Sequence, residues 1–164
     1  MKIVSLIIAC SAAFSCCSQN TNDRGKNYDI SNYYLYDSTT IDKSGFFLKL
    51  YKNKADENLK MEEDYIDSSR KFIVIRSFLK DNLKNGPIFY FDNLWPLRPN
   101  KIAGSGTYVN DKREGEWVHY FSKSGKIEEI KYYKNDLATG TWKYFDESGK
   151  LLKTEEWKDG HVQE

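Results

Sequence analysis

A motif that is written twice near the C-terminus constrains the fold more than any other feature of the sequence. Residues 115 to 126 read GEWVHYFSKSGK, and residues 140 to 150 read GTWKYFDESGK. A more divergent copy stands earlier, because KDNLKNGPIFYFD at 80–92 aligns without a gap with KNDLATGTWKYFD at 134–146. Self-similarity at such intervals is typical of repeat proteins, in which each unit is one supersecondary structure that packs against its neighbours. The repeat region therefore covers residues 80–164, with a partial unit at its end.

Each unit predicts a β-hairpin. The segment DESG at 146–149 suits a type I turn, with glycine at the left-handed residue that closes a bulged hairpin. The pairs Asn135-Asp136 and Asp159-Gly160 suit reverse turns between units, because Asn, Asp and Gly tolerate positive φ. Gly140 stands inside a strand and predicts a bulge or a close backbone approach. We therefore expect an all-β fold, an antiparallel meander of hairpin repeats, marked by Gly86, Gly115, Gly140, Trp117, Trp142, Trp157 and Tyr144.

The aromatic residues of the repeats allow two interpretations. In a strand, Trp142 and Tyr144 point to one face, and Trp117 and His119 do so in the earlier copy. Aromatic side chains at the same place in successive hairpins are most simply a core ladder of cross-strand pairs. The alternative is a platform that binds a ligand. We expect the core ladder.

The repeat pattern resembles that of a known family. The motif G-x-W-x-x-Y is followed by G-K-[IL] and then by an aromatic residue with K-N-D or K-D-G. This pattern resembles the MORN repeat variant of the YwqK-type antitoxin-like family and of many bacterial lipoproteins, over roughly residues 78–164. The resemblance implies a β-hairpin repeat protein used for protein interaction, and some members of the family act as immunity proteins against secreted toxins.

The residues before the repeats are also rich in predicted strands. The segments YYLY (33–36), FFLKLYK (46–52) and KFIVIRSFL (71–79) hold many β-branched and aromatic residues. Residues 54–66, KADENLKMEEDYI, place their apolar residues at a poor 3.6-residue spacing and predict either one short helix or a charged loop. We expect residues 33–79 to form one continuous domain with residues 80–164.

The first residues predict a leader. Lys2 precedes a mostly apolar stretch, 3–14, that is too short to span a bilayer as a helix. The segment AFSC at 13–16 resembles the lipobox of bacterial lipoproteins, in which the Cys thiol accepts diacylglycerol and becomes the acylated N-terminus. We predict a signal peptide at 1–15 and lipidation of Cys16, with Cys17 as the alternative site; an ordinary secretory leader is the other interpretation. Residues 16–32 are then the lipidated N-terminus and a polar tether.

Charge and residue types argue against several classes of function. The 25 Lys and Arg residues are balanced by 24 Asp and Glu residues, whereas a nucleic-acid partner requires a basic face. Three Cys and two His without a CxxC pair do not assemble a zinc cage, and we expect no metal and no cofactor. His119 occupies the place of Tyr144 in the next unit, and neither it nor His161 lies in a catalytic motif. We expect no enzyme activity and no catalytic residue.

One segment departs from the repeat pattern. Between Asp92 and Gly104 the sequence NLWPLRPNKIA inserts a Trp, an Arg and two Pro residues. Trp95 and Arg98 are candidate binding residues, because prolines limit the entropy lost on binding and Trp with Arg is a frequent hot-spot pair. The other interpretation is that Trp95 caps the end of the sheet.

These features together predict a lipid-anchored protein of a bacterial envelope. We expect the outer membrane, because Ser18-Gln19 follows the cysteines with no Asp that would favour retention at the inner one. The expected function is that of a non-catalytic protein-interaction module, with the immunity-like role resting on the resemblance. The alternative is a sheet that lies on a phospholipid surface. This is disfavoured because the chain has a formal net charge of +1, which becomes zero when Lys2 is removed with the leader, and because it has no polybasic segment. An envelope enzyme is the third hypothesis.

Overall fold

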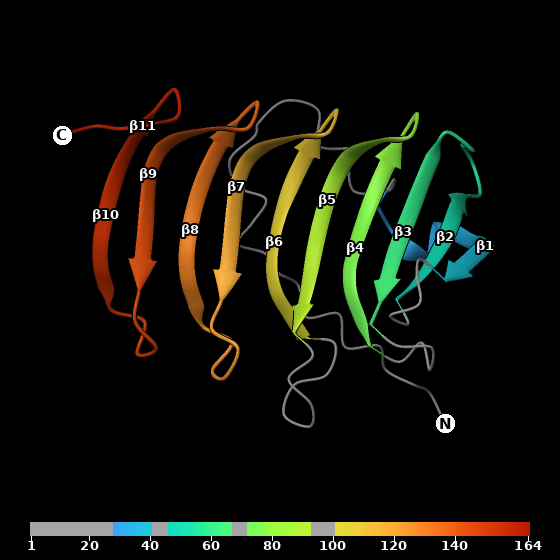
Figure 1. The fold of residues 1–164 in the computed structure, drawn as a ribbon, viewed down its shortest axis with the longest axis horizontal. Helices are drawn as coiled ribbons and strands as arrows, with labels where there is room; N and C mark the ends of the chain where they lie inside the picture. Colours follow the sequence, from blue (N-terminus) through green and yellow to red (C-terminus); the bar gives the residue numbers. More distant parts are fainter. Residues whose placement is uncertain (1–27, 41–45, 67–71, 93–100) are drawn as a thin grey trace.

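The described strands form one long antiparallel sheet. The computed structural model describes residues 28–40, 46–66, 72–92 and 101–164. Each strand pairs with the next along the chain, so the predicted all-β meander is confirmed (Figure 1). A 3₁₀ turn, η1 (Ile30–Asn32), precedes the first strand, and no described helix is long and apolar enough to cross a bilayer. The strands are β1 (Tyr33–Thr40), β2 (Phe47–Asn53), β3 (Leu59–Tyr65), β4 (Ile73–Lys80), β5 (Leu83–Asp92), β6 (Lys101–Val109), β7 (Lys112–Tyr120), β8 (Ile127–Lys134), β9 (Leu137–Phe145), β10 (Leu151–Lys158) and β11 (His161–Val162).

The turns have the geometry that their residues predict. Asn135 and Asp136 have φ values of 50° and 70°, and Asp159 and Gly160 have 50° and 84°, so both pairs form the tight reverse turns between units. At the opposite ends of the strands, in the turn between β9 and β10, Asp146 Oδ1 accepts backbone hydrogen bonds from Ser148 (2.8 Å) and Lys150 (3.0 Å). These turns fix the register of the strands that they join.

A wide bulge recurs at the repeated glycine. Between the pairs Ser105–Val118 and Thr107–Glu114, one residue of β6 faces three residues of β7, including Gly115. The same one-against-three arrangement recurs at Gly140, which lies in β9 opposite Lys131 of β8. The glycine has a φ of 72° in the first case and 66° in the second, a region that side chains rarely adopt. The glycine of the motif therefore bends the first strand of each unit, as expected for Gly140.

The predicted short helix or charged loop at 54–66 is wrong for most of its length. Residues 59–65 form β3, and the alternate positions Met61, Glu63 and Tyr65 are buried. The buried charge is stabilised locally, because the Glu63 carboxylate accepts hydrogen bonds from the Arg76 guanidinium (2.6 Å) and from the Tyr65 hydroxyl (2.7 Å). Burial opposes ionisation of Glu63, but these hydrogen bonds outweigh it and hold the pKa of the carboxyl below its usual range. The polar sequence of residues 59–65 therefore forms a half-buried strand, in which every second residue is buried.

The core differs between the two halves of the sheet. In the N-terminal strands, Tyr33, Met61 and Phe78 form one buried cluster, and Phe47, Tyr65 and Ile73 form another. In the C-terminal strands, Trp117 and Trp142 are buried, with 7% and 9% of their surface exposed. Both tryptophans occupy the repeated position that a core ladder requires.

Replacement of Trp142 by alanine should destabilise the protein by about 3 to 5 kcal/mol, because it removes a large buried ring and leaves a cavity. The ring also stacks on Trp157, with centroids 4.5 Å apart, so this contact is lost too. Thermal melts followed by circular dichroism measure the effect. A Lys143→Ala variant, which changes the exposed neighbour on the opposite face, is the matched control and should melt like the wild type. Equal melting of the Trp142→Ala variant and this control would contradict the ladder.

Candidate functional site

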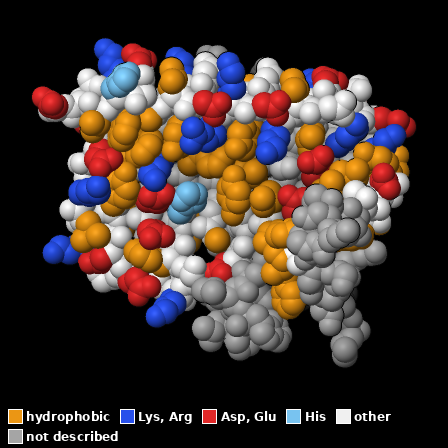
Figure 2. Space-filling model, in the orientation of Figure 1, with side chains coloured by type: hydrophobic (Ala, Val, Ile, Leu, Met, Phe, Trp, Pro, Cys, Tyr) orange, Lys and Arg blue, Asp and Glu red, His pale blue; other side chains and the backbone are white. Residues whose placement is uncertain are grey.

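A row of aromatic side chains crosses one face of the sheet from β5 to β10. Neighbouring ring centroids lie 5.2 Å apart for Tyr108 and Trp117, 6.1 Å for Trp117 and Tyr133, and 5.4 Å for Tyr133 and Trp142. Figure 2 shows this face as a belt of hydrophobic atoms interspersed with basic and acidic groups. We call the following residues the aromatic row: Tyr90, Tyr108, Trp117, Tyr133, Trp142 and Trp157.

Cations lie over the rings of the row. The Arg113 guanidinium is 3.9 Å from the centroid of the Tyr133 ring, and Lys131 Nζ is 5.1 Å from that of Trp142. Each cation also pairs with an acid: Arg113 Nε lies 3.1 Å from Asp136 Oδ1, and Lys131 Nζ lies 2.7 Å from Glu129 Oε2. The positive charges that lie over the aromatic row are therefore largely neutralised by the neighbouring carboxylates.

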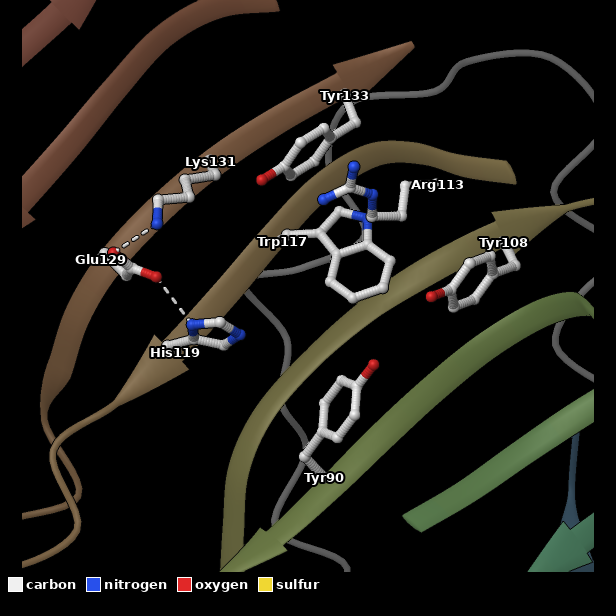
Figure 3. Close-up of a pocket in the computed structure, with 8 residues that line it drawn as sticks. All are labelled: Tyr90, Tyr108, Arg113, Trp117, His119, Glu129, Lys131 and Tyr133. Atoms are coloured by element: carbon white, nitrogen blue, oxygen red, sulfur yellow. Dashed lines mark hydrogen bonds and ion pairs between the residues drawn. The ribbon is translucent and has the colours of Figure 1, made fainter. Parts of the chain in front are cut away.

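A hollow with a volume of about 430 Å³ opens in the middle of the row (Figure 3). Figure 3 shows Tyr90 and Tyr108 turning their hydroxyls toward the Trp117 ring, with His119 on the opposite side. The hollow combines ring surfaces with hydroxyl, imidazole and carboxylate groups. Its lining consists of Tyr90, Tyr108, Arg113, Trp117, His119, Glu129, Lys131 and Tyr133.

Two glycines of β6 allow the rings of Trp117 and His119 to lie close to the backbone. A Cβ atom on Gly106 would overlap the Trp117 ring, and one on Gly104 would lie 2.6 Å from Cδ2 of His119. In the next unit, β8 carries Lys131 at the place of Gly106, opposite the bulge. It carries Glu129 at the place of Gly104, because Glu129 pairs with Tyr144 as Gly104 pairs with His119. One copy of the repeat therefore lacks two side chains, and the Trp117 and His119 rings lie close to the β6 backbone there.

The polar groups of the hollow are ordered by Glu129. Its Oε1 lies 2.7 Å from His119 Nδ1, and its Oε2 forms an ion pair with Lys131 Nζ at 2.7 Å. Burial, with the neighbouring Tyr108 hydroxyl, raises the pKa of Tyr90 to about 12, so this hydroxyl stays protonated at neutral pH. The Trp117 Nε1 atom is buried and has no hydrogen-bond partner among the described residues, whereas Trp142 Nε1 donates to the Tyr132 carbonyl at 3.1 Å.

The residues singled out from the sequence lie partly in this region. Trp117 and His119 belong to the hollow, and Trp142, Tyr144 and Trp157 continue the same face toward the C-terminus. Cys16, Cys17, Trp95 and Arg98 lie outside the described residues, so their roles stay predictions. Within the described ranges, no group of three His, Cys, Asp or Glu residues could hold a metal ion.

Sequence reasoning missed Gly104 and Gly106 as residues of the candidate site, at which Trp117 and His119 approach the backbone. It also missed Tyr90, Tyr108 and Arg113 as partners of Trp117. An alignment of the second strands of the units would have found the glycines, because GSG at 104–106 stands where EIK stands at 129–131.

Comparisons with known proteins place the chain in no family. No protein-family model matches it, and no curated protein does. Among solved structures, the crystal structure of TarM matches with a TM-score of 0.28 and 12% identity. The match covers 79% of this chain and 22% of that chain, so the present chain spans about a fifth of its length.

Replacement of Gly106 by alanine should displace the Trp117 ring and cost about 1 to 3 kcal/mol, as overpacking of a well-filled site does. A lower melting temperature and altered tryptophan fluorescence would report the change. Ser105→Ala is the matched control, because it alters the adjacent residue on the opposite face of the same strand. A Gly106→Ala variant with wild-type stability and fluorescence would show that the ring does not lie on this glycine.

Proposed function

We propose that the chain is a non-catalytic protein-interaction module, held at a bacterial envelope membrane by a lipid on Cys16. The observation that carries the protein partner is the open edge of the last long strand. β10 runs from Leu151 to Lys158, but β11 pairs only with Trp157 and Lys158. The rest of the outer edge of β10 has no strand partner within the described ranges.

An open strand edge is best satisfied by another polypeptide. Its alternating N–H and C=O groups match the main chain of an added strand, a mode used by many peptide-binding proteins. The Glu156 carbonyl accepts a hydrogen bond from the Gln163 N–H (2.8 Å), so the main-chain groups of Glu156 point outward from β9. Because the direction alternates along a strand, the N–H and C=O of Thr154 also point outward. An extended segment of a partner protein would continue the sheet there.

The charge distribution favours a protein over a phospholipid surface. Attraction to anionic headgroups requires clustered cations without acidic neighbours. Here Lys131 pairs with Glu129, Lys153 pairs with Glu155 at 2.7 Å, and Arg113 pairs with Asp136. The sheet therefore offers alternating charges, and the membrane contact is assigned to the lipid on Cys16. An outer-membrane location and an immunity-like role belong to the same proposal and rest on the sequence features alone.

The edge proposal predicts that Thr154→Pro abolishes partner binding with little loss of stability. Proline removes the outward N–H and places its ring where a partner strand would lie, and it is tolerated on edge strands. Thr154→Val keeps the N–H and the strand geometry, so it is the matched control. The measurement compares the proteins crosslinked to each variant in cells, together with a thermal melt of each purified variant.

Three results would decide the matter. A protein crosslinked to the wild type and to Thr154→Val, but lost from a folded Thr154→Pro variant, supports the proposal. Equal crosslinking of all three overturns it. Sedimentation that shows a dimer of this chain, disrupted by Thr154→Pro, would identify a second copy in place of a different partner.

The anchor proposal predicts that membrane-extracted protein begins at Cys16 and carries a diacylglyceryl group on its thiol. Intact-mass measurement detects both features, and Cys16→Ala should leave the membrane fraction. Cys17→Ala is the control and should stay bound, because the adjacent thiol is not the acceptor. A soluble wild-type protein without added mass would disprove the anchor.

A further inference from the structure

The hollow in the aromatic row is lined differently from the corresponding place in the next unit, and its lining is suited to a small ligand. Where β8 carries Glu129 and Lys131, β6 carries Gly104 and Gly106. The Trp117 and His119 rings lie against the backbone at these two glycines, and the hollow opens beside the rings. Figure 3 shows the side chains that surround it. We propose that the hollow binds a neutral saccharide of one or two rings.

The size of the hollow fits a small ligand. Its volume of about 430 Å³ lies in the lower part of the range of small-molecule sites, roughly 300 to 1,000 Å³. One or two pyranose rings suit such a space, whereas a folded protein element does not. The hollow opens on the sheet face, so a sugar at the end of a longer chain can enter from solvent.

The lining matches both sides of a sugar ring. A pyranose presents apolar C–H groups on its faces and hydroxyls around its rim. Tyr90, Tyr108 and Tyr133 offer ring surface for the former and phenol hydroxyls for the latter, and such amphipathic side chains suit a ligand of mixed polarity. Trp117 is buried among them and holds them apart, with its ring at nearly a right angle to that of Tyr108 (88°).

Glu129 sets His119 Nε2 as a hydrogen-bond acceptor in the hollow. The Glu129 carboxylate bonds to His119 Nδ1 at 2.7 Å, which favours the proton on that nitrogen. In the neutral imidazole, Nε2 is then an acceptor, and it has no hydrogen-bond partner among the described residues. A sugar hydroxyl can donate to Nε2, while another donates to the oxygen of the Tyr90 hydroxyl.

Charge balance selects a neutral ligand. Arg113 is paired with Asp136, and Lys131 is paired with Glu129. An anionic ligand would have to compete with these carboxylates for the cations, and a cationic ligand would meet Lys131 and Arg113. A neutral polyhydroxylated ligand leaves both pairs in place, which is why an uncharged sugar is preferred to a phosphate, a uronic acid or an amino sugar.

The test is calorimetric titration of the full-length protein, in a detergent without a sugar headgroup, with glucose, galactose, N-acetylglucosamine and cellobiose. Glucuronate and protonated glucosamine are the charged probes. We expect at least one neutral sugar to bind about tenfold more tightly than its charged counterparts. Saturable binding of a charged probe with equal or higher affinity, or no saturable binding of any neutral sugar, overturns the proposal.

The site is located with His119→Tyr. This substitution installs the side chain that the next unit carries at Tyr144, so the fold has a precedent for it, and the larger ring fills the hollow. We expect at least a tenfold loss of sugar affinity. His161→Tyr is the matched control, because it makes the same change on β11, away from the hollow, and should bind like the wild type. Unchanged binding by a folded His119→Tyr variant overturns the assignment.

A second variant keeps the test decisive if His119→Tyr misfolds. Tyr90→Phe removes one hydroxyl and keeps the ring, and it should weaken binding at least threefold. Tyr34→Phe, on an exposed residue of β1, is its control. Sugar binding is measured here without any protein partner, so its failure would leave the proposed strand addition at β10 untouched.

Discussion

The fold depends on cross-strand contacts between aromatic rings. The described strands form one layer, so rings on each face pack against neighbours along that face and not against a second sheet of strands. The chain meets this constraint by repeating a tryptophan at one place in two successive units, whereas the first unit has Ile88 at that place. Trp117 lies between Tyr108 and Tyr133, and Trp142 lies between Tyr133 and Trp157. Each hairpin therefore supplies part of the core of the next one, as in other linear repeat proteins.

The sequence predicts the repeat half of the sheet in detail, because turn residues and ring spacing act locally there. Asn135-Asp136 and Gly149 adopt the positive φ values that their residue types suggest. The error at 54–66 has a non-local cause. Glu63 is buried on β3 because Arg76, on β4, neutralises it, and a single segment does not reveal its partner. Strands whose buried positions include a paired charge do not show the usual alternation of apolar and polar residues.

The candidate site was harder to predict for a related reason. Tyr90, Tyr108, His119 and Tyr133 are spread over four strands, and their convergence depends on the sheet register. The bulges are part of that register, because three residues of β7 fit opposite one residue of β6. A motif search looks for residue types that carry chemistry, whereas here the informative residues are two glycines. Their meaning appears only by comparison with the side chains at the same places in the next unit.

The repeat architecture also explains how a hollow can exist without loss of the sheet. In a globular core, deletion of two side chains leaves a cavity whose cost grows with its volume. In this sheet the rings of Trp117 and His119 fill the places of the missing side chains at Gly106 and Gly104, and the hollow opens beside these rings on the face of the sheet. Backbone pairing on both sides of β6 continues across it, with Tyr90 and His119 both opposite Gly104. A repeat protein can thus change one unit into a binding site while its neighbours keep the fold, and the unit that departs from the consensus is where a ligand should be sought.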